Sequence, residues 1–261
     1  MGSNTRILLQ PTAEAVGADG LLGAVRRLIA LTKVVGEDDL LTDSLIPLAE
    51  HIFLEDDDAP RRALLDAARR NRRLSDMLLD RVLPGVARRI GTAWEDDSMS
   101  FVDVTIVSTR VQDAVRLLGR FALPASDADS LMVIVPRWEQ HTLPAAFLSD
   151  RFRKLGAPTR LVGGLAVPEL ARAIARAAPS ALMITSGSYW SLDLMRDLIR
   201  DLRRAVPRAI PIVVGGPALH MDETGGRSVG ANLATNDLLA ALRYCDFPLC
   251  AIDGSAAPVS A

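Results

Sequence analysis

The sequence contains few cysteines and no long hydrophobic run. Among its 261 residues only two are cysteines, Cys245 and Cys250. Two cysteines do not make a disulfide framework, so we interpret them as ordinary thiols, of which one or both are buried. No apolar run approaches the ~20 residues that cross a bilayer, and the first residues lack the apolar core of a signal peptide. We therefore expect a cytoplasmic protein that does not enter a membrane.

A strong charge of one sign is also absent. The net charge is −2 at pH 7 and the pI is about 6.0. A protein that binds DNA by itself carries a positive field that attracts the phosphate backbone. We therefore expect direct DNA binding to be absent or weak. The arginines between residues 69 and 89 form either a solvated helix face or part of a contact with a partner or DNA, and both interpretations stay open.

The first half of the chain predicts helices without strands. Apolar residues recur at helical spacing over 21–35, over 40–54 and almost throughout 61–120, with a turn at 95–98. Pro84 stands inside one apolar stripe, where it should kink the helix or mark the junction of two pieces. We interpret residues 19–125 as a helical bundle that acts as a cap domain, preceded by a flexible lead-in over residues 1–18.

In the second half, after a linker near residues 123–127, the spacing of apolar residues changes from that of helices alone to that of alternating strands and helices. Short apolar strands are expected at 131–135, 159–162, 181–185 and 210–214, and helices at 145–155, 168–177, 192–206 and 233–242. Alternating strands and helices predict a parallel sheet with crossover helices. We expect a flavodoxin-like (Rossmann-type), doubly wound sheet over residues 126–250, followed by a flexible tail over 251–261.

Three segments that follow expected strands contain the candidate ligand-binding residues of the chain. They are Glu139-Gln140-His141-Thr142-Leu143-Pro144, Ser186-Gly187-Ser188 and Gly215-Gly216. Open α/β sheets bind ligands where strands end and loops begin. Each segment alone is a weak signal, but their order and spacing together resemble cobalamin-binding domains, which have an Asp-x-His-x-x-Gly loop, a Ser-x-Leu turn and a Gly-Gly turn.

The resemblance implies a role for each matching residue. His141 would be the lower axial ligand of cobalt, and Glu139, in place of the usual Asp, would hold the second ring nitrogen of that histidine. Ser186 would contact the displaced base of the cofactor. Further residues that the resemblance places at the cofactor are Thr142, Leu143, Gly187, Ser188, Gly215 and Gly216. The chain departs from the pattern at Pro144, where the family has glycine, and at Ser188, where it has leucine.

Other segments resemble the same group of proteins. The segment 90–97 is similar to the cap that covers the upper corrin face, with Trp94 against the upper ligand; the alternative is a tryptophan in the core of the bundle. The Glu-His pair of light-sensing transcription factors is replaced by Val104 and Thr105. Residues 230–235 are similar to a Gly-Ala-Asp-x-x-Ala segment that leads into the last helix. Trp138 is expected to line the pocket wall or shield the sheet edge.

The combination of features resembles the AerR/PpaA family of photosynthesis regulators from purple bacteria. The features are the Glu-x-His-Thr-Leu loop, the arginine-rich helical half and the lack of a helix-turn-helix. The family implies a light-responsive antirepressor that is not an enzyme, binds adenosyl- or hydroxocobalamin, and acts on a repressor of photosynthesis genes. Three alternatives stay open: a corrinoid methyl carrier of a methyltransferase system, a redox sensor with heme on His141, and a domain without cofactor that makes only protein contacts.

Overall fold

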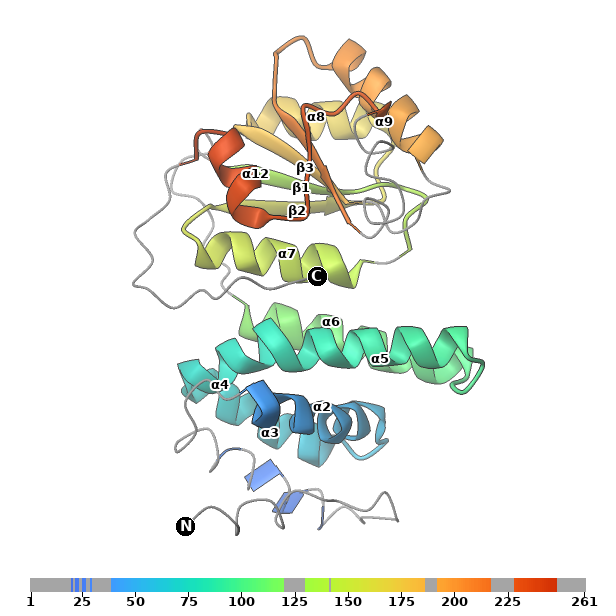
Figure 1. Cartoon of the computed structure of the whole chain (residues 1–261), viewed down its shortest axis with the longest axis vertical. Coiled ribbons are helices and arrows are strands. Elements are labelled where there is room, and N and C mark those ends of the chain that lie inside the picture. The colour runs from blue at the N-terminus through green and yellow to red at the C-terminus, as the bar shows by residue number, and fades with distance from the viewer. Residues whose placement is uncertain are drawn as a thin grey trace. The chain divides into compact units, whose positions relative to one another are not determined.

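The computed structural model describes residues 20, 22–23, 25–26, 29, 39–119, 130–140, 142–185, 192–216 and 228–247. The chain divides into two compact units, residues 1–119 and 120–261 (Figure 1). The first unit is helical and the second contains a parallel sheet with helices, so the expected fold class is confirmed. No helix among the described residues is long and apolar enough to cross a membrane. The expected lead-in, linker and tail lie outside the described residues.

The described part of the first unit is a group of packed helices. These are α2 (Asp39–Leu54), α3 (Asp58–Arg70), α4 (Arg72–Met77), α5 (Leu83–Glu95) and α6 (Phe101–Leu118), with a π-helical turn, η2 (Leu78–Val82), between α4 and α5. The apolar stripes expected from the sequence face inward, and Phe53, Leu64, Val86 and Val111 are fully buried. Arg110 of α6 donates to the carbonyl oxygens of Phe53, Leu54 and Glu55 at 2.8–3.0 Å, which satisfies the C-terminal end of α2.

Pro84 marks the junction of two helical pieces, as its position predicted. Proline has no N–H, and its ring clashes with the carbonyl group four residues earlier in a continuous α-helix. The chain widens into the π-helical turn just before this point, and Pro84 then occupies the first turn of α5. The interrupted hydrogen-bond ladder is therefore accommodated without ending the run of helix.

The second unit contains a five-stranded parallel sheet. Its strands are β1 (Leu131–Val135), β2 (Thr159–Gly163), β3 (Ala181–Thr185), β4 (Ile212–Gly215) and β5 (Leu233–Ala234). The spatial order is β2-β1-β3-β4-β5, which is the doubly wound order that the alternation predicted. The crossover helices are α7 (Leu143–Lys154), α8 (Val167–Ala177) and α9 (Leu192–Ala205), and α12 (Leu238–Tyr244) is the last described helix.

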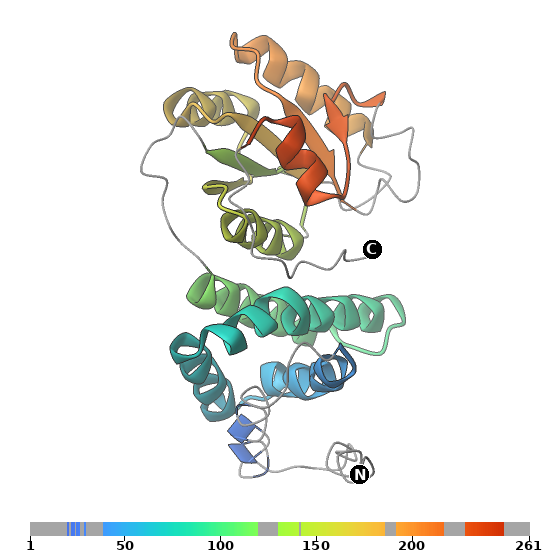
Figure 2. The ribbon, with the colours of Figure 1, turned by 60° about the vertical axis from the view of Figure 1, so that its left-hand side comes forward.

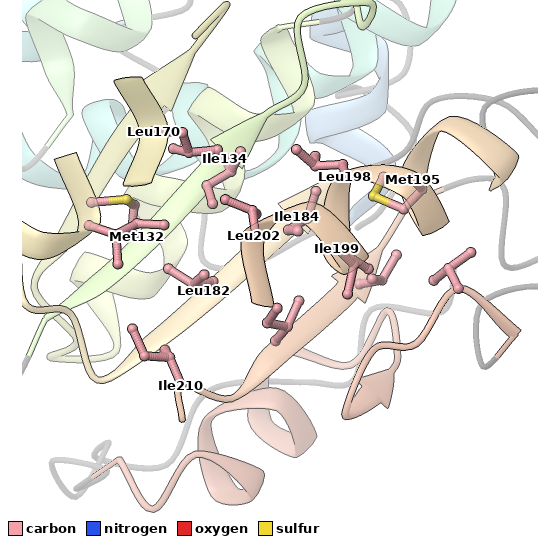
Figure 3. Close-up of a cluster of buried hydrophobic side chains, with 14 of the residues drawn as sticks. Met132, Ile134, Leu170, Leu182, Ile184, Met195, Leu198, Ile199, Leu202 and Ile210 are labelled. Carbon is pink, nitrogen blue, oxygen red and sulfur yellow. The ribbon is translucent and has the colours of Figure 1, made fainter. Parts of the chain in front are cut away.

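Both faces of the sheet are covered by helices (Figure 2). Side chains alternate along a strand, so Met132 and Ile134 of β1 pack under α8 and α9, while Leu131 and Val133 pack under α7 and α12. Figure 3 shows the cluster under α8 and α9, where Leu182 and Ile184 of β3 meet Leu198 and Leu202 of α9. Burial on both faces explains why β1 is apolar throughout and β3 is apolar up to Thr185, its last residue.

The expectation of a helix over 233–242 is wrong at its first residues. Leu233 and Ala234 form β5 and pair with Val213 and Val214 of β4. Oδ1 of Asn232 accepts from the backbone amide of Ile212 at 2.8 Å, and the backbone amide of Asn232 donates to the Ile212 carbonyl at 2.8 Å. These bonds hold the segment in extended form. The helix begins only after Asp237, whose carboxylate accepts from the amides of the first turn.

We expect the substitution Gly85→Ala to destabilise the helical unit. A Cβ at this position would meet the side chain of Ile46 on α2, with Cγ1 only 2.9 Å away, so the Ile46 side chain would have to change its rotamer or α2 and α5 would have to separate. The expected loss is about 1–3 kcal/mol of unfolding free energy, measured by urea denaturation. The matched control is Gly91→Ala on the same helix, where no atom lies within 4 Å. That control should stabilise the unit by about 0.5–1 kcal/mol, and equal effects of the two substitutions would contradict the packing argument.

Candidate functional site

The candidate site lies at the carboxyl edge of the sheet. Strand β3 pairs with β1 on one side and with β4 on the other, all in parallel, so the carboxyl ends of these three strands are neighbours. Each of the three motifs follows or ends one of these strands. His141, Ser186, Gly187 and Ser188 lie outside the described residues. The described residues on either side of these four form the part of the site whose geometry follows.

The loop after β1 leads directly into α7. The amide of Glu139 donates to the Pro136 carbonyl at 3.0 Å, and that of Thr142 donates to the Gln140 carbonyl at 3.1 Å. Thr142 is the residue before α7 and Leu143, the first helical residue, is buried. Pro144 stands in the first turn of α7, where a helix needs no N–H. The proline that replaces the family's glycine therefore fits the start of the helix.

An apolar hollow of about 480 Å³ opens beside this loop, at the carboxyl ends of β1 and β2. Its described lining comprises Ile134, Val135, Pro136, Arg137, Trp138, Val162, Gly163, Leu165, Ala166, Val167, Leu170 and Leu198. Trp138 forms part of the wall of this hollow. Its expected place at the cofactor stays a prediction. Ile134, Leu170 and Leu198 place the hollow on the α8 and α9 side of the sheet.

Thr185 is a further candidate residue that the sequence analysis missed. It ends β3, is 8% exposed, and its Oγ1 is buried without a hydrogen-bond partner in the described structure. Ala181 and Met183 of the same strand face α7 and α12, so the alternation of side chains places Thr185 on that side as well. An unpaired buried hydroxyl costs about 1–3 kcal/mol. The signal in the sequence was a hydroxyl at the end of an otherwise apolar strand, immediately before Ser186.

The two glycines at the end of β4, Gly215 in the strand and Gly216 directly after it, are required by the fold itself. A Cβ on Gly215 would lie 2.9 Å from the carbonyl oxygen of Thr235. Gly216 has a φ of 124°, a conformation that favours glycine, and its amide donates to Oδ1 of Asn236 at 2.7 Å. These contacts bring the segment after β5 against the end of β4. The predicted role of both glycines toward a nucleotide tail stays a prediction.

Trp94 is not a core residue of the helical unit. Its side chain is 47% exposed at the end of α5, and it contacts Phe101, which is 68% exposed, in an edge-to-face pair with ring centroids 6.0 Å apart. The alternative of a buried tryptophan is therefore wrong. Nearby, Thr105 stands where the light sensors have histidine, and its hydroxyl donates to the Phe101 carbonyl at 2.7 Å. A contact between Trp94 and an upper ligand stays a prediction.

The part of the chain that the structure describes offers few side chains that could bind a metal ion. Among those residues no three His, Cys, Asp or Glu side chains are grouped as a metal site. Burial, with a smaller effect of the Asp246 carboxylate, raises the pKa of the Cys245 thiol to about 11. Cys245 is therefore protonated at neutral pH and is a weak nucleophile and ligand. Cys250 lies outside the described residues.

Comparison with known proteins found similarity to several solved structures and to one curated protein. A protein of Rhodobacter capsulatus, described as an uncharacterized 20.5 kDa protein in the bchF-crtJ intergenic region, is 29% identical over 160 residues, or 60% of this chain and 83% of that protein. A cobalamin-binding protein from Desulfitobacterium hafniense is 14% identical with a TM-score of 0.40, covering 89% of this chain and 98% of that one. The methanol:cobalamin methyltransferase complex MtaBC from Methanosarcina barkeri is 14% identical with a TM-score of 0.35, covering 82% and 76%. No protein-family model matches the chain.

We expect Gly215→Ala to weaken the edge of the sheet that forms the candidate site. The new methyl group would press on the backbone oxygen of Thr235, which cannot move without breaking the pairing of β4 with β5. The expected loss is about 1–3 kcal/mol in thermal or urea unfolding. Gly163→Ala is the control, because its Cβ would lie 3.4 Å from Cβ of Val135, an ordinary contact. A variant at Gly215 as stable as this control would show that the close approach is not required.

Proposed function

We propose that the protein is a cobalamin-binding sensory regulator, a light-responsive antirepressor that acts on a repressor of photosynthesis genes. One observation carries the cofactor part of the proposal. The motif segments with His141, with Ser186 and with Gly215 follow or end β1, β3 and β4, and these strands are neighbours in one parallel sheet. Ligands of open α/β sheets bind at such carboxyl ends. The strand order therefore supports the motif match independently of the motif itself.

The described residues fit a large apolar ligand with polar groups. The hollow beside β1 and β2 presents apolar walls and one arginine, Arg137. Thr185 offers a buried hydroxyl that lacks a partner in the described structure. The glycine at position 215 has no Cβ that would project from the end of β4. In the proposal His141 holds cobalt from below, Glu139 orients that histidine, and the segments at Ser186 and Gly216 hold the tail of the cofactor.

The regulatory part of the proposal rests on the family resemblance and on the relative from Rhodobacter capsulatus. That protein is described by its position between bchF and crtJ, which supports a role in the control of photosynthesis genes. When bound, an alkylcobalamin supplies a cobalt–carbon bond that light can break. The protein itself is proposed to act without catalytic residues of its own, as a two-state element whose partner affinity depends on the state of its ligand.

The helical unit is proposed to convert a change in the bound cofactor into a change of the surface that the partner binds. Trp94 and Phe101 expose apolar rings at the junction of α5 and α6. We assign this exposed aromatic pair to contact with a ligand or a partner. In the proposal the Trp94 ring contacts the upper face of the cofactor, and loss of the upper ligand changes the surface that the repressor binds.

The test is the absorption spectrum of the purified chain after incubation with adenosylcobalamin, in the dark and after illumination. We expect retained cobalamin and a light-dependent spectral change. The variant His141→Ala should retain the cofactor at least about tenfold more weakly, since loss of a ligand costs more than loss of its outer partners. The control is His51→Ala, because His51 is an exposed residue of α2. This control should behave as the parent protein.

The outcomes of this experiment separate the alternatives. Cobalamin that is retained in the dark without a response to light would favour a methyl carrier. A Soret band after addition of heme, without retention of corrinoid, would favour a heme sensor. Retention of neither cofactor would leave a domain that makes only protein contacts. If the two histidine substitutions weakened cofactor retention equally, the assignment of His141 as the axial ligand would be wrong.

We expect Thr185→Val to separate ligand binding from stability. The valine is isosteric and the hydroxyl has no described partner, so the apo protein should be as stable as the parent or more stable. Cobalamin affinity should fall about 2–10-fold if the hydroxyl binds the cofactor. The control is Thr159→Val, which removes a buried hydroxyl that donates to the Ala157 carbonyl at 2.8 Å. It should lower stability without a change in affinity, and the reverse pattern would contradict the assignment.

A further inference from the structure

Two pairs of arginines flank the corner between α3 and α4. Arg69 and Arg70 occupy the last turn of α3, and Arg72 and Arg73 occupy the first turn of α4. Asn71 between them has an extended backbone (φ −130°, ψ 104°), and its side chain accepts from the amide of Leu74 at 3.3 Å. The corner is therefore a defined turn that presents four arginines from two helix ends.

Carboxylates of the described part of the protein pair with only some of the arginines at this corner. Arg72 pairs with Asp76 through Nε at 3.1 Å and Nη2 at 2.9 Å, and this leaves its Nη1 for another acceptor. Arg69, Arg70 and Arg73 are exposed and make no hydrogen bond or ion pair within the described part of the chain. The helix dipole favours cations at the end of α3 but disfavours them at the start of α4. Helix stability therefore accounts for the first pair and not for the second.

A hollow of about 320 Å³ lies at the same corner. Its lining comprises Ala68, Arg69, Arg70, Arg72, Ser75, Leu117 and Leu118. Ser75 is buried, with its hydroxyl 3.4 Å from the Leu118 carbonyl. The Leu117 side chain at the end of α6 is 46% exposed. The hollow thus combines guanidinium groups with an exposed apolar side chain.

The geometry points to a docking surface for an acidic segment of a partner protein. Guanidinium groups bind carboxylates in a bidentate manner, and a partner's apolar side chain would cover Leu117. Nucleic acid fits less well, because the chain has a net charge of −2 and the carboxylates of Asp66, Asp76 and Asp113 stand on the same helices. This surface belongs to the helical unit, and the inference holds whether or not the α/β unit binds a corrinoid.

The test measures binding of the full chain, without cofactor, to a fluorescein-labelled synthetic peptide in which leucines alternate with pairs of glutamates. Fluorescence anisotropy gives the affinity. We expect the double variant Arg69→Gln/Arg70→Gln to bind about tenfold more weakly, because each change removes a charge-assisted contact. The control is Arg62→Gln/Arg88→Gln, which removes the same charge from two exposed arginines elsewhere in the unit. This control should change the affinity less than about twofold.

Three results would overturn the inference. Equal weakening in both double variants would show that the peptide responds only to net charge. Absence of binding to the parent protein would remove the surface altogether. Tighter binding of a labelled DNA duplex, lost in the variant at positions 69 and 70, would assign the surface to nucleic acid. Circular dichroism of both double variants verifies that each one is folded, and a peptide with serine in place of leucine tests the contribution of Leu117.

Discussion

Parallel pairing of β3 with both β1 and β4 is the interaction on which the candidate site depends. It brings the chain at residues 135, 185 and 215 to one edge of the sheet, although these positions are far apart in the sequence. A slip of β1 or β3 by one residue would exchange the side chains that pack under α8 and α9 with those that pack under α7 and α12. The close approach of Gly215 to Thr235 then joins the segment after β5 to the same edge.

This edge offers different chemistry on the two sides of the sheet. The side of α8 and α9 has an apolar hollow with Trp138 in its wall. The side of α7 and α12 has the Thr185 hydroxyl at the end of β3, which finds no hydrogen-bond partner among the described residues. A ligand that lies across the edge would therefore meet apolar surface on one side and a hydrogen-bonding group on the other. A corrinoid, with a broad ring and a polar tail, has this combination of needs.

The helical unit presents two surfaces of opposite character. The junction of α5 and α6 exposes the rings of Trp94 and Phe101 beside acidic residues 95–97. The corner of α3 and α4 exposes arginines around a hollow. Buried leucines and valines hold the helices that carry both surfaces, and the π-helical turn before Pro84 keeps α4 and α5 in one run. In the proposed function, the aromatic surface would contact the ligand, and the arginine corner is the inferred surface for an acidic partner segment.

The sequence by itself determined the elements whose periodicity is local. The expected and observed bounds agree for β1 and β3, because burial on both faces of a strand leaves an apolar run of neighbouring residues. Only the tertiary structure decided the extended form of Leu233 and Ala234, because their strand depends on bonds between Asn232 and Ile212, twenty residues away. The same holds for Thr185, whose hydroxyl the folded sheet buries without a partner among the described residues, and for Trp94, whose exposure depends on how α5 and α6 pack.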